Sequence, residues 1–287
     1  MQEELKLQIA TVLGTGITGA TPLAGGDIST AYLLQTKMER FFCKVHFADH
    51  ALSMFLAEKD GLETISRSET LRAPKVVYCG PLEKGACLLL EFIPPGPASS
   101  AAMEVLGRKL AAMHLKSSEK FGFSSNNFIG SLPQLNNEHN HWLSFYMQER
   151  LLPQLGMARN RGLLSKEEIP DEAVVEAVLG NCFQEISASL LHGDLWSGNY
   201  LISAQGEPYL IDPAVYYGHS EVDLAMSRLF GGFDSTFYSA YEEVIPRAPG
   251  YEKRQDIYQL YYLLVHLNLF GRSYYSAVSG ILRKHFG

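Results

Sequence analysis

The stretch Leu190–Leu201 reads LLHGDLWSGNYL and contains the most informative spacing in the chain. An apolar run leads into a His-Gly-Asp triplet that ends at Asp194, and Asn199 follows five positions later. After a short polar interval, a second apolar run, Tyr209–Ile211, ends in Asp212. Taken singly, each of these polar residues would suit a turn or a helix cap. Their joint spacing favours a catalytic loop that is followed by a hairpin.

This layout is typical of the catalytic loop of kinases, which in protein kinases reads H-R-D-x-x-x-x-N. There the aspartate accepts the proton of the attacking hydroxyl, while the asparagine and a later aspartate reach Mg²⁺ ions on the nucleotide phosphates. We therefore predict Asp194 as the catalytic base and Asn199 and Asp212 as Mg²⁺ ligands. Asp212 stands where the aspartate of D-F-G would be, although Pro213 and Ala214 replace Phe-Gly.

The strand expected at 40–46 reads RFFCKVH and carries one lysine among apolar residues. Alternation along a strand puts Lys44 and His46 on the same face. A lysine on such a strand is costly to bury without an anion, so Lys44 is predicted to hold the α- and β-phosphates of ATP. The helix expected at about 50–66 offers Glu58 as its carboxylate partner. The other candidates on that helix are Asp60 and Glu63.

Two further segments are predicted to surround the nucleotide. Gly25 and Gly26 lie between two strand-like runs, so we expect a hairpin turn whose backbone N–H groups cover the phosphates. An ordinary hairpin turn is the alternative. The strand at 87–93 ends in a Pro-Pro-Gly-Pro cluster, which predicts a hinge between two lobes. Backbone groups of its last residues would hold the adenine edge: Glu91, Phe92 and Ile93.

These elements predict an α+β, bilobal, protein-kinase-like fold. Residues 1–93 would form a small β-sheet lobe with a helix that covers the nucleotide, and residues 94–287 a larger helical lobe with the catalytic loop and the substrate site. The turn at 14–19 matches G-x-G-x-x-G, but it follows a helix rather than a strand, so we interpret it as a helix stop. The polar loop at 121–137 is expected to line the substrate pocket.

In the second lobe, Ser220 is a candidate helix cap, with Asp223 as the capping-box acid three residues later. The stretch 252–270 is rich in Tyr and Leu almost all round, which predicts a buried helix. Its His266 and Asn268 are therefore interpreted as hydrogen-bonded core residues. The remaining long helices are expected at about 103–114, 141–157, 166–187, 234–246 and 273–285.

The composition limits the possible functions. The chain has 287 residues, of which 46% are hydrophobic and 19% are charged, as in ordinary soluble proteins. A net charge of −7 argues against a nucleic-acid partner. The four cysteines form no CxxC pair and are expected to be reduced core residues. We see neither a signal peptide nor a membrane span, so a cytoplasmic location without membrane contact is expected.

At this point the chain resembles the fructosamine/ketosamine 3-kinase family, which is related to the aminoglycoside phosphotransferases. The resemblance runs from about Leu23 almost to the C-terminus. Its most specific segments are LLHGDLWSGN at 190–199 and IDPAVYYGHSEVDLAM at 211–226, with LFGGF at 229–233 and LNLFG at 267–271 in addition. Trp196 after HGDL is the sharpest discriminator, because aminoglycoside and choline kinases usually carry another residue there.

The resemblance implies ATP- and Mg²⁺-dependent phosphorylation of the 3-hydroxyl of a ketosamine, an adduct of a sugar and an amine. Phosphorylation makes the adduct unstable and releases the amine, which is a deglycation repair. The resemblance also implies that Trp196 forms a wall against the sugar, and it places His192 at the substrate. The acceptor would be a small ketosamine or a glycated protein lysine, and the protein a monomer or a weak dimer.

Two departures from the family pattern and two alternative functions stay open. His46 stands where Asn or another small polar residue is expected, and Ser220 stands where Arg is common, which leaves the specificity open. The first alternative is a kinase of another small alcohol, such as an aminoglycoside or choline. The second is a nucleotide-binding pseudokinase, against which the retained Lys44 and Asp194 count. The identity of the sugar is also open.

Overall fold

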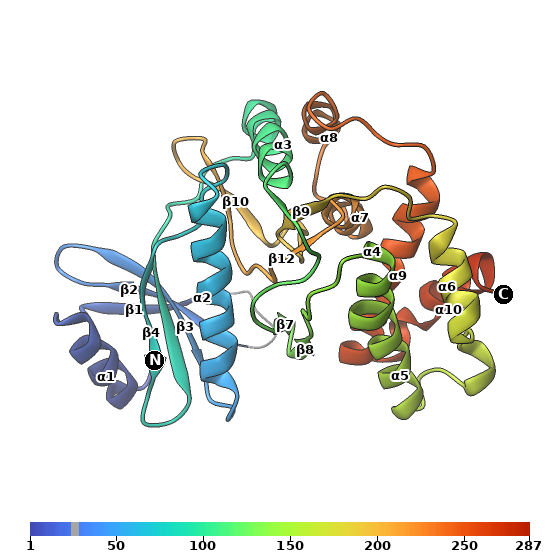
Figure 1. Cartoon of the computed structure of the whole chain (residues 1–287). Helices are drawn as coiled ribbons and strands as arrows, with labels where there is room; N and C mark the ends of the chain where they lie inside the picture. The colour runs from blue at the N-terminus through green and yellow to red at the C-terminus, as the bar shows by residue number, and fades with distance from the viewer. Residues whose placement is uncertain (24–28) are drawn as a thin grey trace.

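The computed structural model describes residues 1–23 and 29–287. Figure 1 shows a smaller N-terminal lobe with a β-sheet and a larger, mainly helical C-terminal lobe. This architecture confirms the predicted α+β, bilobal fold. The predicted phosphate-covering turn at Gly25 and Gly26 lies outside the described residues, and the boundary after residue 93 stays a prediction.

The N-terminal lobe is built on a five-stranded antiparallel sheet with the strand order β1-β2-β3-β5-β4. Its strands are β1 (Gly19–Leu23), β2 (Thr30–Gln35), β3 (Arg40–His46), β4 (Val76–Pro81) and β5 (Ala86–Glu91). The helix α1 (Glu3–Leu13) ends at Gly14, whose φ of +65° is left-handed, as the interpretation of the glycine-rich turn required. The helix α2 (Ala51–Arg67) follows β3.

The alternation along β3 gives the sheet two different faces. Phe41, Cys43 and Val45 pack in a core with Ile9 of α1. Lys44 points to the other face, where strand pairing places it between Ala31 and Leu88. On that face the sheet packs against the apolar side of α2, through residues such as Phe55, Leu62, Leu88 and Leu90. The predicted strand and its alternation are therefore confirmed.

The Pro-Pro-Gly-Pro segment after β5 is hydrogen-bonded to the C-terminal lobe. The N–H of Gly96 donates to the carbonyl of Ile202 at 2.8 Å, and the N–H of Ala204 donates to the carbonyl of Pro94 at 2.8 Å. Below this junction one hydrophobic core contains residues of both lobes, such as Leu90, Leu190 and Leu210. The junction thus keeps the sheet and the catalytic segment in a fixed relation.

The C-terminal lobe is mainly helical. Its helices are α3 (Ser100–His114), α4 (Trp142–Phe145), α5 (Leu152–Asn160), α6 (Glu172–Gly180), α7 (Glu221–Leu229), α8 (Ser235–Glu242), α9 (Tyr251–Phe270) and α10 (Tyr275–His285). The helix predicted at 141–157 contains one turn of π-helix, Tyr146–Leu151, between α4 and α5. The buried helix predicted at 252–270 is α9, most of whose residues are inaccessible to solvent.

Short strands frame the catalytic segment. They are β6 (Ser117–Ser118), β7 (Asn127–Ile129), β8 (Leu132–Gln134), β9 (Ala188–Leu191), β10 (Tyr200–Ile202), β11 (Pro208–Leu210) and β12 (Tyr216–Gly218). β9 leads directly into the His-Gly-Asp triplet, and β10 and β11 form the predicted hairpin before Asp212. The β7–β8 hairpin lies between α2 and the helical lobe (Figure 1).

The predicted helix cap at Ser220 is wrong. Ser220 has helical dihedral angles, φ −52° and ψ −30°, and its side chain makes no capping hydrogen bond. Asp223 does not complete a capping box, because its carboxylate is turned toward the backbone N–H groups of His192 and Gly193.

Of the four cysteines, Cys43, Cys87 and Cys182 are buried and Cys79 is partly buried, and all four are free thiols. Over the ranges 1–23 and 29–287, no helix combines the length and the apolar character needed to cross a membrane.

Candidate active site

The catalytic loop and the segment after β11 lie side by side and are joined by backbone hydrogen bonds. The N–H of Ile211 donates to the carbonyl of Asn199 at 3.0 Å, and the N–H of Ala214 donates to the carbonyl of His192 at 2.8 Å. Gly193 has a φ of +85°, and a Cβ atom there would overlap the carbonyl oxygen of Ala214. Only glycine permits this close approach without strain, so the triplet needs its middle residue for a geometric reason.

Asp194 and Asn199 are in direct contact. The Nδ2 of Asn199 donates to the carbonyl oxygen of Asp194 at 2.9 Å and to its Oδ2 at 3.1 Å. This orientation leaves the Oδ1 of Asn199 as an acceptor atom for a cation. Burial and the nearby carboxylate of Asp212 raise the pKa of Asp194 to about 7. A general base works best when its pKa lies near the working pH, so the environment of Asp194 suits proton transfer.

Lys44 connects the sheet to both α2 and the second functional segment. Its Nζ donates to Oε1 of Glu58 at 2.8 Å and also to Oδ1 of Asp212. Burial alone would lower the pKa of Lys44, but the two carboxylates raise it overall, so the ammonium is charged. Of the three acids considered on α2, Glu58 is the one that pairs with Lys44. Asp60 instead accepts a hydrogen bond from Ser125 at 3.3 Å.

Asp212 is held in an uncommon backbone conformation. Its φ is +53°, a left-handed value that aspartate tolerates better than most residues. Its side chain is 41% exposed and faces the cavity described below. Burial acts to raise the pKa of Asp212, but the adjacent Lys44 more than offsets this and lowers it. The carboxylate of Asp212 is therefore ionised and available to a cation.

His192 stabilises the catalytic loop through hydrogen bonds of both ring nitrogens. It is fully buried; the N–H of Asp194 donates to its Nδ1 at 3.2 Å, and its Nε2 donates to the carbonyl of Ile211 at 2.9 Å. Burial lowers the pKa of His192, so the ring is neutral. This geometry argues against the predicted substrate contact of His192, because both ring nitrogens are occupied and no part of the ring reaches the solvent.

Two residues that sequence reasoning missed support the same loop. Asp223 accepts hydrogen bonds from the N–H groups of His192 at 2.7 Å and Gly193 at 2.9 Å, and it contacts Nε2 of His114 at 3.1 Å. The hydroxyl of Tyr262 donates to the carbonyl of Gly193 at 2.8 Å. The signal for Asp223 was its place among apolar residues of a buried helix, which is the argument that singled out Lys44.

A cavity of about 720 Å³ lies between the lobes and brings most of the predicted site residues together. One group of lining residues is polar: Lys44, Glu58, Asp194, Asn199 and Asp212. A second group is aromatic: Trp196, Phe230, His266, Phe270 and Tyr274. The interpretation of His266 as a core residue was thus incomplete, because its ring reaches the cavity. Trp196 also lines the cavity, and its indole ring lies against Gly198, where a Cβ atom would collide with it.

The β7–β8 hairpin contributes to the cavity wall, in agreement with the prediction for the loop at 121–137. Its two buried amides fix it to the chain just after Asp212. Asn127 Nδ2 donates to the carbonyl of Val215 at 2.8 Å, and Gln134 Nε2 donates to Asn127 Oδ1 at 2.8 Å. Movement of this hairpin would therefore disturb the second functional segment.

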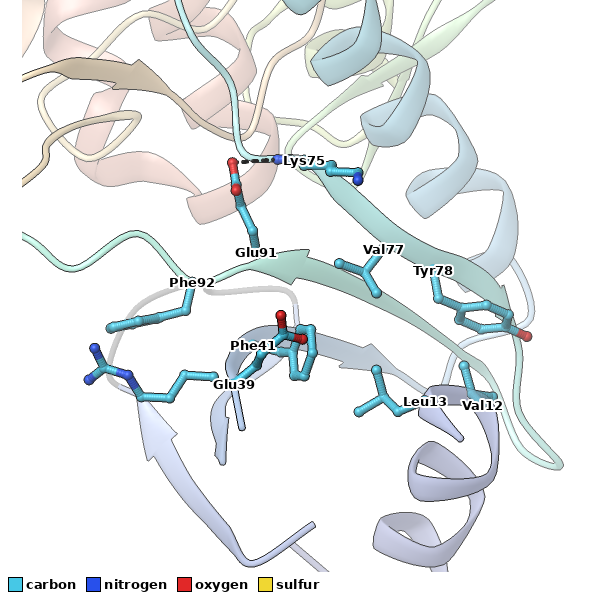
Figure 2. Close-up of a pocket in the computed structure, with 10 residues that line it drawn as sticks. Val12, Leu13, Glu39, Phe41, Lys75, Val77, Tyr78, Glu91 and Phe92 are labelled. Atoms are coloured by element: carbon cyan, nitrogen blue, oxygen red, sulfur yellow. Dashed lines mark hydrogen bonds between the residues drawn. The ribbon is translucent and has the colours of Figure 1, made fainter. Parts of the chain in front are cut away.

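The three residues predicted at the adenine edge differ in their environment. The carboxylate of Glu91 accepts the N–H of Lys75 at 2.9 Å, as Figure 2 shows, and its own N–H donates to the carbonyl of Lys75 at 2.9 Å. The N–H of Glu91 is therefore not available to a nucleotide. Within the described ranges we find no backbone hydrogen bond from Phe92 or Ile93 to another residue. These two residues are the better candidates for an adenine contact.

A second cavity, of about 710 Å³, lies beside α1 (Figure 2). Its lining includes Phe41, which alternation along β3 places on the face of the sheet opposite Lys44. It is lined by residues such as Leu13, Phe41 and Tyr78, together with the charged Glu39 and Lys75. None of the residues predicted to carry the chemistry lines it except Glu91 and Phe92. The residues predicted as the base, the phosphate-binding pair and the Mg²⁺ ligands line the cavity between the lobes instead.

The donor atoms fit a Mg²⁺ ion that arrives with a nucleotide. Asn199 and Asp212 offer amide and carboxylate oxygens, which are the hard ligands that Mg²⁺ prefers. In the part of the chain that the structure describes, no cluster of three or more His, Cys, Asp or Glu residues could hold a metal alone. Mg²⁺ commonly takes only one or two protein oxygens and completes its shell with phosphates and water.

Comparison with known proteins identifies the family. The sequence model of the fructosamine kinase family matches residues 1–286. A probable ketoamine kinase of Enterococcus faecium is 40% identical over 92% of this chain and 94% of its own length. The chloroplastic protein-ribulosamine 3-kinase of Arabidopsis thaliana is 40% identical over 93% of this chain and 82% of its own length.

Comparison with solved structures supports the same family and fold. A putative fructosamine-3-kinase from Haemophilus somnus superposes with a TM-score of 0.88 at 26% identity, covering 99% of this chain and 97% of the other. A spectinomycin phosphotransferase, solved with ADP and spectinomycin, has a TM-score of 0.63 at 14% identity over 100% and 95% of the two chains. The latter likeness concerns the fold alone and confirms the predicted kinase-like architecture. The chain belongs to the fructosamine kinase family.

Proposed function

We propose that this protein is an ATP-dependent ketosamine kinase that phosphorylates the 3-hydroxyl of sugar–amine adducts. The observation that carries the proposal is the joint placement of Asp194, Asn199 and Asp212 beside the Lys44–Glu58 pair in one cavity. Family membership supports the substrate class, because relatives that are about 40% identical are named ketoamine kinase and protein-ribulosamine 3-kinase.

In this proposal Asp194 orients the attacking hydroxyl and accepts its proton. Phosphoryl transfer passes through a loose transition state, so positioning and charge compensation supply most of the catalysis. The hydrogen bonds from Asn199 to Asp194 fix the carboxylate. Hydrogen bonds of the buried residues His192 and Asp223 keep the loop in place. The base is thus held by a rigid frame before the acceptor arrives.

Lys44 is proposed to hold the α- and β-phosphates, with Glu58 keeping its ammonium in position. Asn199 and Asp212 would hold Mg²⁺, which when bound offsets the negative charge on the transferred phosphoryl group. Backbone groups of Phe92 and Ile93 are proposed for the adenine edge, and Gly25 and Gly26, which lie outside the described residues, are proposed for the phosphates. The ADP named for the spectinomycin phosphotransferase, which shares this fold, supports nucleotide use.

The acceptor is proposed to include glycated lysine side chains of proteins. One relative is named a protein-ribulosamine 3-kinase, and two aromatic residues that line the cavity, Phe230 and Phe270, are exposed at its edge. Phosphorylation would make the adduct unstable and release the amine, which would be a repair of glycation.

The function is tested by ATP-dependent release of ADP in the presence of Mg²⁺. The acceptors compared are ribulose-lysine, fructose-lysine, choline and an aminoglycoside, and Asp194→Asn serves as the control. Turnover on a ketosamine that is lost in Asp194→Asn is the expected result. Turnover on choline or the aminoglycoside alone would instead identify a kinase of another alcohol. Tight ATP binding without turnover on any acceptor would identify a pseudokinase.

A further inference from the structure

One face of α9 leads from the catalytic loop along the cavity. On this face, the hydroxyl of Tyr262 donates a hydrogen bond to the carbonyl of Gly193. His266 and Phe270 follow at intervals of four residues, and all three side chains line the cavity. Residues four apart on a helix are separated by about 6 Å along its axis. Along α9, His266 therefore lies one step of four residues beyond Tyr262, whose hydroxyl contacts the catalytic loop, and Phe270 lies two such steps beyond it.

The hydrogen bond of His266 within α9 fixes which ring nitrogen carries the proton. Nδ1 lies 2.8 Å from the carbonyl oxygen of Tyr262, which can only accept. Nδ1 is therefore protonated and donates. Burial lowers the pKa of His266 although this hydrogen bond acts to raise it, so the ring is neutral at neutral pH. Nε2 is then a lone-pair acceptor, and in the described part of the chain it has no hydrogen-bond partner.

An aromatic wall, made of Phe230, Phe270 and Tyr274, surrounds this histidine. The ring centroids lie 4.8 Å, 5.5 Å and 5.0 Å, respectively, from that of His266. Phe230 is 42% exposed and Phe270 is 49% exposed, although large aromatic side chains are normally buried. The wall therefore continues from the cavity to the molecular surface and offers ring faces that attract cations.

The charged residues of the cavity are compatible with a cationic acceptor. Its described lining contains three carboxylates, one lysine and two histidines. The ammonium of Lys44 is engaged by Glu58 and Asp212, and the described lining contains no second lysine and no arginine. An alkylammonium group on the acceptor therefore meets no unpaired cationic side chain in this lining.

The spacing along α9 matches the covalent structure of a ketosamine. Four bonds separate the oxygen of its 3-hydroxyl from its amine nitrogen, so the two atoms lie roughly 5 Å apart when the chain is extended. One helical turn is about 5.4 Å. The hydroxyl of Tyr262 contacts Gly193, the neighbour of Asp194, so an extended ketosamine that starts at Asp194 and follows α9 would bring its amine toward His266.

We propose that Nε2 of His266 accepts a hydrogen bond from the protonated amine of the ketosamine, and that the aromatic wall contacts the alkyl stem that continues from this amine. The inference rests on the proposed function and names the part of the acceptor that is recognised. It assigns selectivity for adducts of alkylamines, such as a lysine side chain, over ketoses that lack an amine. His266 is a specificity-determining residue and takes no part in proton transfer from the hydroxyl.

The test combines two enzyme variants with two acceptors. His266→Phe keeps the ring and removes the acceptor atom, while His266→Gln keeps an acceptor atom. The acceptors are a ribulose-lysine peptide and 1-deoxyribulose, which lacks the amine. In His266→Phe we expect the KM for the peptide to rise roughly 10- to 100-fold, the range for loss of a hydrogen bond to a charged group. The KM values for 1-deoxyribulose and for Mg·ATP should stay unchanged, and His266→Gln should recover part of the loss.

The controls separate this inference from folding and from the proposed function. His141→Phe changes an exposed histidine that does not line the main cavity and should leave every constant unchanged. Thermal unfolding of each variant reports on folding, and His266→Gln provides the comparison if His266→Phe is unstable. Equal losses on both acceptors, or an unchanged KM for the peptide, would overturn the role of His266. A wild-type enzyme inactive on every ketosamine would overturn the proposed function itself.

Discussion

The carboxylate of Asp223 lies directly behind the catalytic loop, where its Oδ1 accepts the backbone N–H of Gly193 at 2.9 Å. Its Oδ2 accepts the N–H of His192 at 2.7 Å and contacts His114 at 3.1 Å. Burial would raise the pKa of Asp223, but His114 and the other donors lower it overall. A fully buried, ionised carboxylate thus fixes the backbone that carries the proposed base.

Asp223→Asn should weaken both stability and turnover. An amide nitrogen cannot accept the backbone N–H that it would face, and a buried hydrogen bond lost in this way costs about 1–3 kcal/mol. We expect a lower Tm and a reduced kcat, with the KM for Mg·ATP nearly unchanged, because the loop geometry rather than the nucleotide contacts is disturbed. Glu104→Gln, a change at an exposed acid of α3, is the control. Unchanged stability together with unchanged turnover in Asp223→Asn would refute this role.

Asp194→Asn should abolish turnover and yet stabilise the fold at neutral pH. Burial and Asp212 raise the pKa of Asp194 from 3.8 to about 7 in the folded protein. The charged form is thus disfavoured by folding, and stability is lost as the pH rises from the unfolded pKa through the folded one. Removal of the charge should raise the Tm at pH values above about 7, and the gain should fade toward about pH 4. Thermal unfolding without nucleotide or Mg²⁺ measures this, and a constant difference at all pH values would contradict it.

Glu58→Gln should raise the KM for Mg·ATP roughly tenfold, the effect expected when a charge-assisted hydrogen bond is weakened. The physical reason is that Lys44 loses the ion pair that holds its ammonium in the cavity. Glu63→Gln provides a matched control, because Glu63 lies on the same helix and pairs at the surface with Lys59 and Arg67. Steady-state kinetics with varied ATP would distinguish the two variants, and equal effects would argue against a special role for Glu58.

Gly193→Ala should destroy activity more than backbone strain alone explains. Gly193 and Gly206 have nearly equal φ values, +85° and +82°, so an alanine at either position carries a similar strain of about 1–2 kcal/mol. Only at Gly193 would the new Cβ atom overlap the carbonyl of Ala214, whereas the space at Gly206 is empty. We expect Gly206→Ala to lose some Tm and keep its turnover. Gly193→Ala should lose turnover and Mg·ATP binding. Similar kinetics in the two variants would show that close packing of Gly193 against Ala214 is not needed for activity.

Local sequence patterns predicted the elements that depend on near neighbours. The alternation of β3 placed Lys44 correctly, and the spacing from Asp194 to Asn199 anticipated a contact that the folded loop makes. The hairpin between β10 and β11 also followed from apolar runs and a polar interval. The residues that form these features are close together in the sequence, so the local pattern of apolar and polar residues determines most of their contacts.

Contacts between distant segments could not be read in the same way. Asp223 meets the N–H of His192 across 31 residues, and the local capping pattern at Ser220 explained the same acid equally well. The motif gave no indication that the ring of His192 faces inward. Likewise, the apolar periodicity of α9 marked His266 as a core residue, although it also lines the cavity.

In the proposed mechanism, Asp194 orients the 3-hydroxyl of a ketosamine toward the γ-phosphoryl group of ATP and accepts its proton. The most direct measurement is analysis of the product by ³¹P NMR and mass spectrometry after incubation of a ribulose-lysine peptide with Mg·ATP. We expect one phosphate on the 3-hydroxyl with the wild-type enzyme, and none with Asp194→Asn. ADP release without a phosphorylated peptide, or a phosphate on another hydroxyl, would contradict this mechanism.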